Sequence, residues 1–340
     1  MAISVVIPAY QRREFLHEAW SSVEGSGGPG LREIVVIKDF EDPALDSPAS
    51  DRLTSIAYGS RNYGGTIARA VRACRGNVVA FLEDDDRFGP TKIARLSAVF
   101  AADSHVAFYH NDYREIDRSG APLAASSQRR AIDRRMSGRA LERYEREEKV
   151  SRFDRLCDSV PSAHLSCVAF GRRSLEPVLP YLERVPIGVD FFLFFAGLAS
   201  DGTLVIDPEQ LTDYRRHSGN SSRALSFNPA WYRELVTGSR AMADATRAML
   251  VELGRRDLLP RLEAELAAHA VYVATAAPAP ERRDVARALA GMLREPISFR
   301  GIERRALFLR AGLFVAEPSW AARIVRPRPT PLPGPPPRPV

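Results

Sequence analysis

The sequence lacks the long hydrophobic runs that cross membranes. Among its 340 residues there is no uninterrupted apolar stretch of about 18 residues, so we expect no transmembrane helix. The chain enters an apolar run at residues 3–7 without a basic segment or a longer apolar region before it, so we expect no signal peptide.

The sequence is also poor in cysteine. Its three cysteines, Cys74, Cys157 and Cys167, are odd in number and have no CxxC spacing, so they give no framework for structural disulfides or zinc. A reducing compartment fits this usage best. We therefore expect a cytoplasmic protein.

Two common nucleotide-binding motifs are absent. A Rossmann domain needs GxGxxG in its first strand-to-helix turn, where this chain has PAYQRR at residues 8–13. The GxxxxGK[ST] loop of P-loop NTPases does not occur either. These absences argue against both classes of nucleotide-dependent enzyme.

The composition is that of a globular, basic protein. With 45% hydrophobic residues the chain can bury a large core, and its net charge of +6 favours anionic partners such as nucleotides, phospholipid headgroups or nucleic acid. A nucleic-acid binder would interleave arginines with exposed aromatic residues, whereas the aromatic residues here fall mostly inside apolar runs. Nucleic acid is therefore not an expected partner.

Residues 1–110 alternate strand-like runs with amphipathic segments, which predicts an α/β fold with a mostly parallel sheet flanked by helices. Strands are expected at 3–7, 34–37, 78–82 and 106–109, and helices at 15–24, at 66–74 and from Pro90 onward, with the proline at an early helical position. Apolar patterning returns at 164–170, 190–198 and 203–206.

The remaining segments suggest how the chain divides. We expect one domain over 1–225, with halves 1–110 and 111–225, and a helical appendage over 226–320. Residues 126–156 are dense in Arg and Glu and predict a mobile or surface helical excursion. Residues 327–340, mostly proline and arginine, predict a disordered tail.

Four consecutive acids, Glu83 to Asp86, directly follow the apolar run at 78–82. They would emerge at the C-terminal end of a buried strand, where open α/β sheets bind ligands. Clustered carboxylates repel one another unless they share a cation, and Mg²⁺ or Mn²⁺ prefers carboxylate oxygens and completes its shell with substrate phosphates. The run predicts a metal-diphosphate site; a solvated acidic turn is the alternative.

An ordered series of motifs resembles glycosyltransferase family 2: SVVIPAY at 4–10, VVIKD at 35–39, RNYGG at 61–65 with Ala68 and Ala73, and GNVVAFLEDDD at 76–86. The series covers roughly the first 110 residues and is more specific than any single motif. The resemblance implies a glycosyltransferase-A type fold and a nucleotide-diphosphate sugar donor, with UDP-sugar favoured. It also implies metal-dependent, inverting transfer in bacterial cell-envelope polysaccharide biosynthesis.

The nucleotide-binding residues that the resemblance implies are Pro8, Ala9, Tyr10, Asp39, Asn62, Glu83 and Asp84. The first three would line the base and ribose pocket, Asp39 would hydrogen-bond the base, and Glu83 or Asp84 would touch the ribose. Asn62 would contact the donor or serve only as a turn residue. The family usually has a further acid where this chain has Lys38.

The resemblance implies Mg²⁺ or Mn²⁺ ligands at Asp85, with Asp86 and His217 as further ligands. His217 belongs to YRRH at 214–217, which together with Asn220 and Ser221 resembles the segment that closes the family's catalytic domain. Arg215 or Arg216 would neutralise the leaving diphosphate. A structural role for His217 is an equal alternative.

Asp190 is the expected catalytic base. It stands at the head of the apolar run 191–195, so partial burial would raise its pKa toward the range useful for taking a proton from a sugar hydroxyl. A helix N-cap is the structural alternative, and the two roles are compatible. The segment GVD at 188–190 resembles the family's base-bearing Glu-Asp segment, with Val189 in place of the Glu.

Several charged residues are weaker candidates. His110, Asp112 and His164 are considered for an acceptor pocket, although packing or turn roles rank first for each. The arginines at 129, 130, 134 and 135 would form a lid over the diphosphate or, as the simpler expectation, a solvated charged helix.

The expected reaction is transfer of the sugar to a hydroxyl of a glycan, lipid-linked or small-molecule acceptor. Segment 302–316, with arginines among apolar residues, would lie on the inner face of the membrane or pack on the catalytic domain. A sugar-nucleotide pyrophosphorylase would need a Gly-rich, Arg-containing loop after the first strand, which this chain lacks. A non-catalytic scaffold with the same fold is the second hypothesis, because Lys38 and Val189 replace acids.

Overall fold

The computed structural model describes residues 1–10, 13–46, 52–60, 62–217, 220, 229–277, 281–294 and 302–316. The contacts between residues divide the chain into two compact units. One consists of residues 1–224 and 233–259, and the other of residues 225–232 and 260–340. The expected tail at 327–340 lies outside the described residues, and the expected division at residue 225 stays a prediction.

The first half of the sheet is parallel. Its strands, in spatial order, are β3 (Leu53–Ala57), β2 (Leu31–Lys38), β1 (Ile3–Ala9) and β4 (Val78–Phe81). All seven residues of β1 are buried, which explains why its sequence is a continuous apolar run rather than an alternating one. Edge strand β3 was not predicted, because most of its residues are half-buried and its apolar signal is weak.

The second half makes the sheet mixed. Strand β8 (Val168–Gly171) lies antiparallel between β4 and β6 (Val106–Ile116), and β6 runs parallel to β9 (Thr203–Arg215). The short strands β5 (Arg87–Phe88) and β7 (Glu142–Tyr144) pair antiparallel with β9. Both β6 and β9 extend well past the predicted strands, because polar residues with partners inside the protein, such as Asn111 and Thr212, continue the pairing where the apolar pattern stops.

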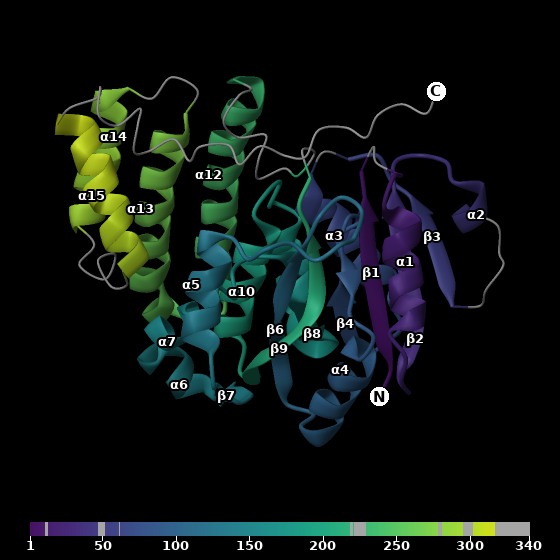
Figure 1. Cartoon of the computed structure of the whole chain (residues 1–340). Helices are drawn as coiled ribbons and strands as arrows, with labels where there is room; N and C mark the ends of the chain where they lie inside the picture. Colours follow the sequence, from purple (N-terminus) through teal and green to yellow (C-terminus); the bar gives the residue numbers. More distant parts are fainter. Residues whose placement is uncertain are drawn as a thin grey trace, which may run out of the picture. The chain divides into compact units, whose positions relative to one another are not determined.

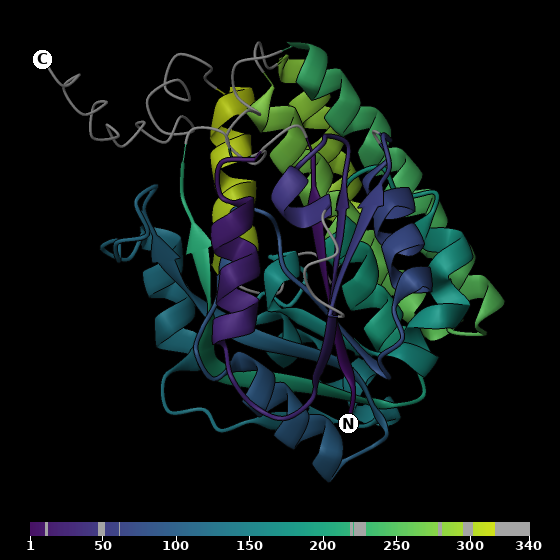
Figure 2. The same ribbon diagram turned by 90° about the vertical axis from the view of Figure 1, so that its right-hand side faces the viewer.

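Helices cover both faces of this sheet (Figures 1 and 2). On one face, α1 (Leu16–Gly25) and α4 (Lys92–Ala102) share a hydrophobic core with alternate residues of β1. Helix α3 (Tyr63–Ala73) contacts β1 and β2 with buried residues outside that core, so it covers the opposite face. Helix α4 begins after Thr91, so Pro90 precedes the helix instead of lying in its first turn as expected.

Shorter helices fill the connections. They are α2 (Pro43–Asp46), α6 (Arg146–Ser151), α7 (Phe153–Cys157), α8 (Arg172–Leu175) and α9 (Leu179–Leu182), with 3₁₀ turns at Leu165–Cys167, Glu176–Val178 and Arg256–Leu258. Helix α3 approaches α9 closely: a Cβ on Gly64 would lie 2.1 Å from the carbonyl oxygen of Leu182. Glycine is therefore required where α3 begins.

The charged excursion is not a fully solvated helix. Helix α5 (Ser127–Met136) is anchored by Arg129, which is only 3% exposed and donates to both carboxylate oxygens of Asp112 at 2.6 and 2.9 Å. Arg129 also lies over the Tyr113 ring, 4.7 Å from its centroid. The expectation of a solvated helix is wrong for this arginine, whereas Arg130 and Arg134 are exposed.

Replacing Arg129 with alanine is expected to destabilise the protein by about 3–5 kcal/mol, because the Asp112 carboxylate would remain buried without its partner. Arg130→Ala is the matched control, since Arg130 is exposed on the same helix. Urea unfolding of both variants measures the difference. Equal stability of the two variants would show that the Arg129–Asp112 pair does not anchor α5.

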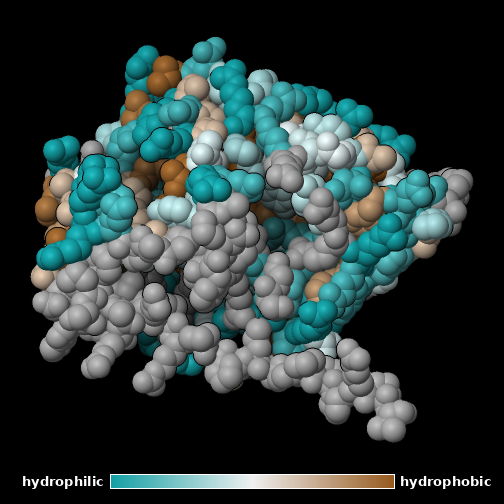
Figure 3. Space-filling view, turned by 90° about the horizontal axis from the view of Figure 1, so that it is seen from above, coloured by the Kyte–Doolittle hydropathy of each residue, from teal (hydrophilic) through white to brown (hydrophobic). Residues whose placement is uncertain are grey.

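The C-terminal part is helical as expected. Helix α12 (Pro229–Glu252) belongs mostly to the first unit, and the second contains α13 (Leu259–Ala276), α14 (Arg282–Arg294) and α15 (Ile302–Ala316). Among the described helices, none is both long and apolar enough to cross a membrane. The coloured atoms of the face in Figure 3 are mostly hydrophilic, with small hydrophobic patches.

Candidate active site

A cavity of about 360 Å³ lies at the C-terminal ends of β1 and β3. Its lining residues are Pro8, Ala9, Tyr10, Tyr58, Ser60, Tyr63, Thr66 and Glu234. The structure thus brings the three residues expected for a base and ribose pocket to one cavity. The sequence reading missed Tyr63 and Glu234, and Glu234 comes from α12, far along the chain.

Lys38 has a structural role at the end of β2. Its buried amine donates to Asp46 and to the carbonyl oxygen of Phe40, both at 2.8 Å, and ties β2 to α2. The hydrogen bond from Lys38 is the main reason that the pKa of Asp46 falls to about 2. The cation is therefore neutralised inside the protein. The contact of the neighbouring Asp39 with a base stays a prediction.

Asn62 caps helix α3. Its side-chain oxygen accepts from the backbone N–H of Gly65 at 3.0 Å, and its amide nitrogen donates to the carbonyl oxygen of Glu183 at 2.6 Å. Both ends of the amide already have protein partners, which favours the turn role over direct contact with a donor.

The four acids form a turn directly after β4. Asp84, Asp85 and Asp86 are buried and Glu83 is half-buried, with the Tyr63 hydroxyl 3.5 Å from a Glu83 oxygen. Burial, and then the negative charge of Asp85, raises the pKa of both Glu83 and Asp86 well above the usual range. Such concentrated negative charge favours binding of a cation.

Asp86 does not point toward a free site. One of its oxygens accepts from the Ser166 hydroxyl at 2.6 Å and the other from the backbone N–H of Arg215 at 2.9 Å. Two strong hydrogen bonds therefore occupy the carboxylate that was expected as a further metal ligand. In this arrangement Asp86 fixes the turn, and its role as a metal ligand stays a prediction.

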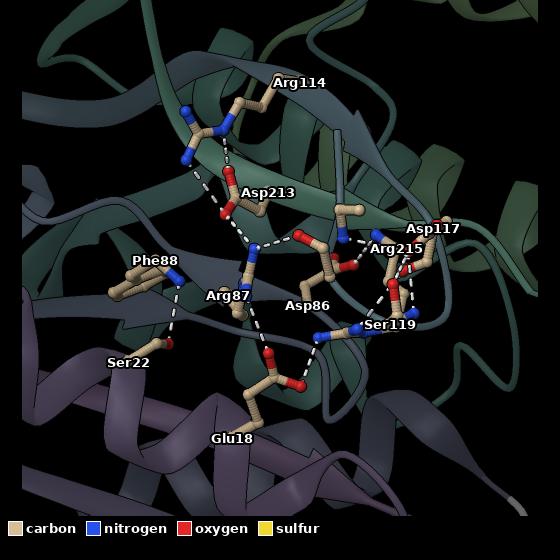
Figure 4. A network of polar contacts seen from close by, with 12 residues as sticks. Glu18, Ser22, Asp86, Arg87, Phe88, Arg114, Asp117, Ser119, Asp213 and Arg215 are labelled. Carbon is tan, nitrogen blue, oxygen red and sulfur yellow. Dashed lines mark hydrogen bonds and ion pairs between the residues drawn. The ribbon is translucent and has the colours of Figure 1, made fainter. Parts of the chain in front are cut away.

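Arg215 lies in the protein interior and its side chain binds the backbone of the acid turn. Its guanidinium donates to the carbonyl oxygen of Asp85 at 2.7 Å and to Glu18 at 2.6 Å, and its charge lies 4.5 Å from the centre of the Phe15 ring. Figure 4 shows Glu18 accepting from both Arg215 and Arg87. This burial contradicts the expected diphosphate contact for Arg215. The same expectation for Arg216, a quarter exposed and paired with Glu115, stays a prediction.

His217 and Asp85 are in contact, although 132 residues separate them in the sequence, and their role as metal ligands stays a prediction. The His217 Nε2 lies 3.0 Å from an Asp85 oxygen, and the Asn220 amide lies 3.5 Å from the same oxygen. Asn220 also accepts from the backbone N–H of His217 at 2.6 Å, which holds the backbone at this residue. Within the described ranges, no group of three or more His, Cys, Asp or Glu side chains converges on a metal-sized space.

Asp190 lies in the first turn of α10 (Val189–Ala199). Gly188, at φ +71°, is the N-cap residue, so the N-cap role suggested for Asp190 is not adopted. Burial raises the pKa of Asp190 to about 6, partly offset by the backbone N–H groups of Phe191, Asp190 and His164. Val189, which replaces the usual Glu, is buried.

Asp190 and the acid turn share one electrostatic environment. The charge of Asp190 contributes to the raised pKa of Glu83. It also contributes to the raised pKa of Tyr63, after burial and the charges of Glu83, Asp84 and Asp85. Tyr63 therefore connects the cavity, the acid turn and the expected base.

The weaker acceptor candidates have structural roles. Asp112 is paired with Arg129. His110 is buried and has its Nε2 3.2 Å from the carbonyl oxygen of Ala163, and burial lowers its pKa to about 3. His164 packs between the rings of Tyr113 and Tyr214, with centroid distances of 4.3 and 4.1 Å. Packing roles rank first for these residues, as expected.

A family model described as "Glycosyl transferase family 2" matches residues 4–179, which is more than half of the chain. The chain belongs to glycosyltransferase family 2. Its relatives include an uncharacterized glycosyltransferase, alr2836, from Nostoc sp., which is 30% identical over 33% of this chain. Another is the putative teichuronic acid biosynthesis glycosyltransferase TuaG from Bacillus subtilis, which is 27% identical over 36% of this chain. The succinoglycan biosynthesis protein ExoO from Rhizobium meliloti is 26% identical over 66% of this chain.

These matches cover 36%, 50% and 64% of the relatives' own lengths. Among solved structures, S. aureus TarS 1–349 in complex with UDP-GlcNAc superposes with a TM-score of 0.54 at 13% identity, covering 95% of this chain and 92% of TarS 1–349. The expected α/β fold of the glycosyltransferase-A type is confirmed for this family 2 member.

Proposed function

We propose that this family 2 protein is a metal-dependent, inverting glycosyltransferase that moves a sugar from a UDP-sugar to a hydroxyl of a glycan, lipid-linked or small-molecule acceptor. The position of Tyr63 is the observation that carries the proposal. Its side chain lines the cavity at Pro8–Tyr10, and its hydroxyl lies 3.5 Å from a Glu83 oxygen. The negative charge of Asp190 contributes to the raised pKa of Tyr63. The neighbourhood of this cavity, the acid turn and Asp190 supports a shared site for a nucleotide, a cation and a base.

The similarity of this chain to a solved glycosyltransferase structure supports the choice of a UDP-sugar. TarS, which shares the fold, is described with UDP-GlcNAc bound. The names of two relatives refer to teichuronic acid and to succinoglycan biosynthesis, which supports a polysaccharide setting and a glycan acceptor. On α15, Leu309 and Leu313 are exposed and lie one turn apart. Contact of this segment with a membrane surface stays a prediction.

The donor set at Asp85 and His217 fits Mg²⁺ or Mn²⁺. A buried carboxylate and an imidazole in contact at 3.0 Å offer two ligands, and such ions take their remaining ligands from water and substrate phosphates. A cation held there would supply positive charge to the departing diphosphate.

The chain's own residues account for the other parts of the reaction. The Asp190 carboxylate takes the proton from the acceptor hydroxyl, whose oxygen bonds to the anomeric carbon as the bond to the UDP oxygen breaks. The raised pKa of Asp190 makes it a stronger base than an ordinary carboxylate. Tyr63 and Pro8–Tyr10 hold the nucleotide so that the sugar faces this base.

Release of UDP from UDP-sugars tests the proposal. Purified protein is incubated with Mn²⁺ and UDP-GlcNAc, UDP-glucose or UDP-galactose, with and without oligosaccharide acceptors, and free UDP is measured. We expect release from one donor, faster with an acceptor. Tight UDP binding without any release would favour the non-catalytic scaffold.

A further inference from the structure

The acid turn is held from one side by a single buried serine. The Ser166 hydroxyl accepts from the backbone N–H of Glu83 at 2.9 Å and donates to the Asp86 carboxylate at 2.6 Å. It therefore bridges the first and the last residue of the four-acid run. Asp85, which meets His217, lies between these two points.

Ser166 is itself firmly held. Its carbonyl oxygen accepts from the Lys92 amine at 2.9 Å and from the Thr212 hydroxyl at 3.2 Å. Lys92 is completely buried, contacts Asn111 and lies 4.5 Å from the centre of the Phe88 ring. A buried amine with several fixed partners leaves Ser166 little freedom, so its hydroxyl keeps one position.

The segment that carries Ser166 also reaches the base. His164, two residues earlier, has a left-handed backbone at φ +63°, which is uncommon for a residue with a side chain. The backbone N–H of His164 helps to lower the pKa of the Asp190 carboxylate. His110 holds the preceding residue, with Nε2 3.2 Å from the carbonyl oxygen of Ala163. One short segment thus contacts both the acid turn and the base.

We propose that Ser166 is a positioning residue of the proposed transferase, whose hydroxyl fixes the acid turn so that Asp85 presents its carboxylate with His217 to the cation and the donor diphosphate. This inference rests on the proposed function. Ser166 does not touch substrate and acts only through Glu83 and Asp86. Ser166 is not among the residues that line the cavity at Pro8–Tyr10.

The test compares UDP binding with and without Mn²⁺ by calorimetry. In Ser166→Ala, the gain in UDP affinity that Mn²⁺ produces is expected to fall by about 10–100-fold, the range for removing a group that helps to orient a metal ligand. UDP affinity without metal should stay at the wild-type value. Ser166→Thr, which keeps the hydroxyl, should restore the Mn²⁺-dependent gain.

Ser159→Ala is the matched control. Ser159 is a buried serine on the same connection, but its hydroxyl donates to the nearby Leu156 carbonyl oxygen, at 2.9 Å, and not to the acid turn. This variant should bind UDP and Mn²⁺ as the wild type does. A double-mutant cycle with Asp86→Asn adds a second readout: if Ser166 acts through Asp86, the effect of S166A shrinks in the D86N background.

Two results would overturn the inference. One is a full Mn²⁺-dependent gain in S166A. The other is an equal loss of UDP affinity with and without Mn²⁺, accompanied by a lower melting temperature, which would make Ser166 a packing residue. A wild type that binds no UDP would instead contradict the proposed function, and the inference with it.

Discussion

Replacing Asp190 with asparagine is expected to slow sugar transfer by about 10²–10⁴-fold, the range that a positioned general base supplies. Asparagine keeps the shape of the side chain and its bond to the N–H of Phe191. UDP binding with Mn²⁺ should therefore stay intact, because Asp190 does not line the cavity at Pro8–Tyr10. Transfer rates and UDP affinity measured on the same preparation separate the two effects.

The pH profile gives an independent check of the same role. Because transfer needs the unprotonated carboxylate and burial raises its pKa to about 6, the rate should be flat above this pH. Below it the rate should fall about tenfold per pH unit, as protonation removes the base. This fall in rate at low pH should be missing in D190N. It should be kept in Asp201→Asn, because the Asp201 carboxylate is exposed. A wild-type rate in D190N would contradict the assignment.

Asp85→Ala is expected to abolish the Mn²⁺-dependent part of UDP binding, a loss of about 100-fold or more if the cation contributes several kcal/mol. The substitution removes a carboxylate ligand and leaves His217 without its 3.0 Å partner. Binding of UDP without metal is the internal control and should match the wild type, since the cavity is unchanged. Calorimetric titration gives both values.

His217→Ala should weaken the same Mn²⁺-dependent term less than D85A does, because the charged ligand remains. Retention of the full Mn²⁺ effect in D85A would show that the cation binds elsewhere.

The parallel half of the fold could be predicted because its strands are buried on both faces. Buried parallel strands give continuous apolar runs, as in β1, and the motifs lie at their C-terminal ends. Strands β3 and β7 could not be predicted, because one is a half-buried edge and the other is a short piece in a charged segment. The resemblance supplied Asp85, His217 and Asp190 as candidates.

The environment of each candidate could not be predicted. Arg215 stands in a motif expected to bind diphosphate, but its main carboxylate partner, Glu18, lies 197 residues away in the sequence. Nothing local indicates that such an arginine is buried. Ser166 gave only a weak signal as a polar residue in the apolar run 164–170, and Tyr63 gave one as an aromatic residue directly before two glycines.

Calorimetric titration of the wild-type protein with UDP, GDP and dTDP, each with and without Mn²⁺, tests the central claim most directly. On the proposed function, UDP binds in the cavity beside the acid turn, and Mn²⁺ strengthens this binding far more than it strengthens any binding of GDP or dTDP. Failure of all three nucleotides to bind a folded protein would contradict the donor site and favour the non-catalytic scaffold.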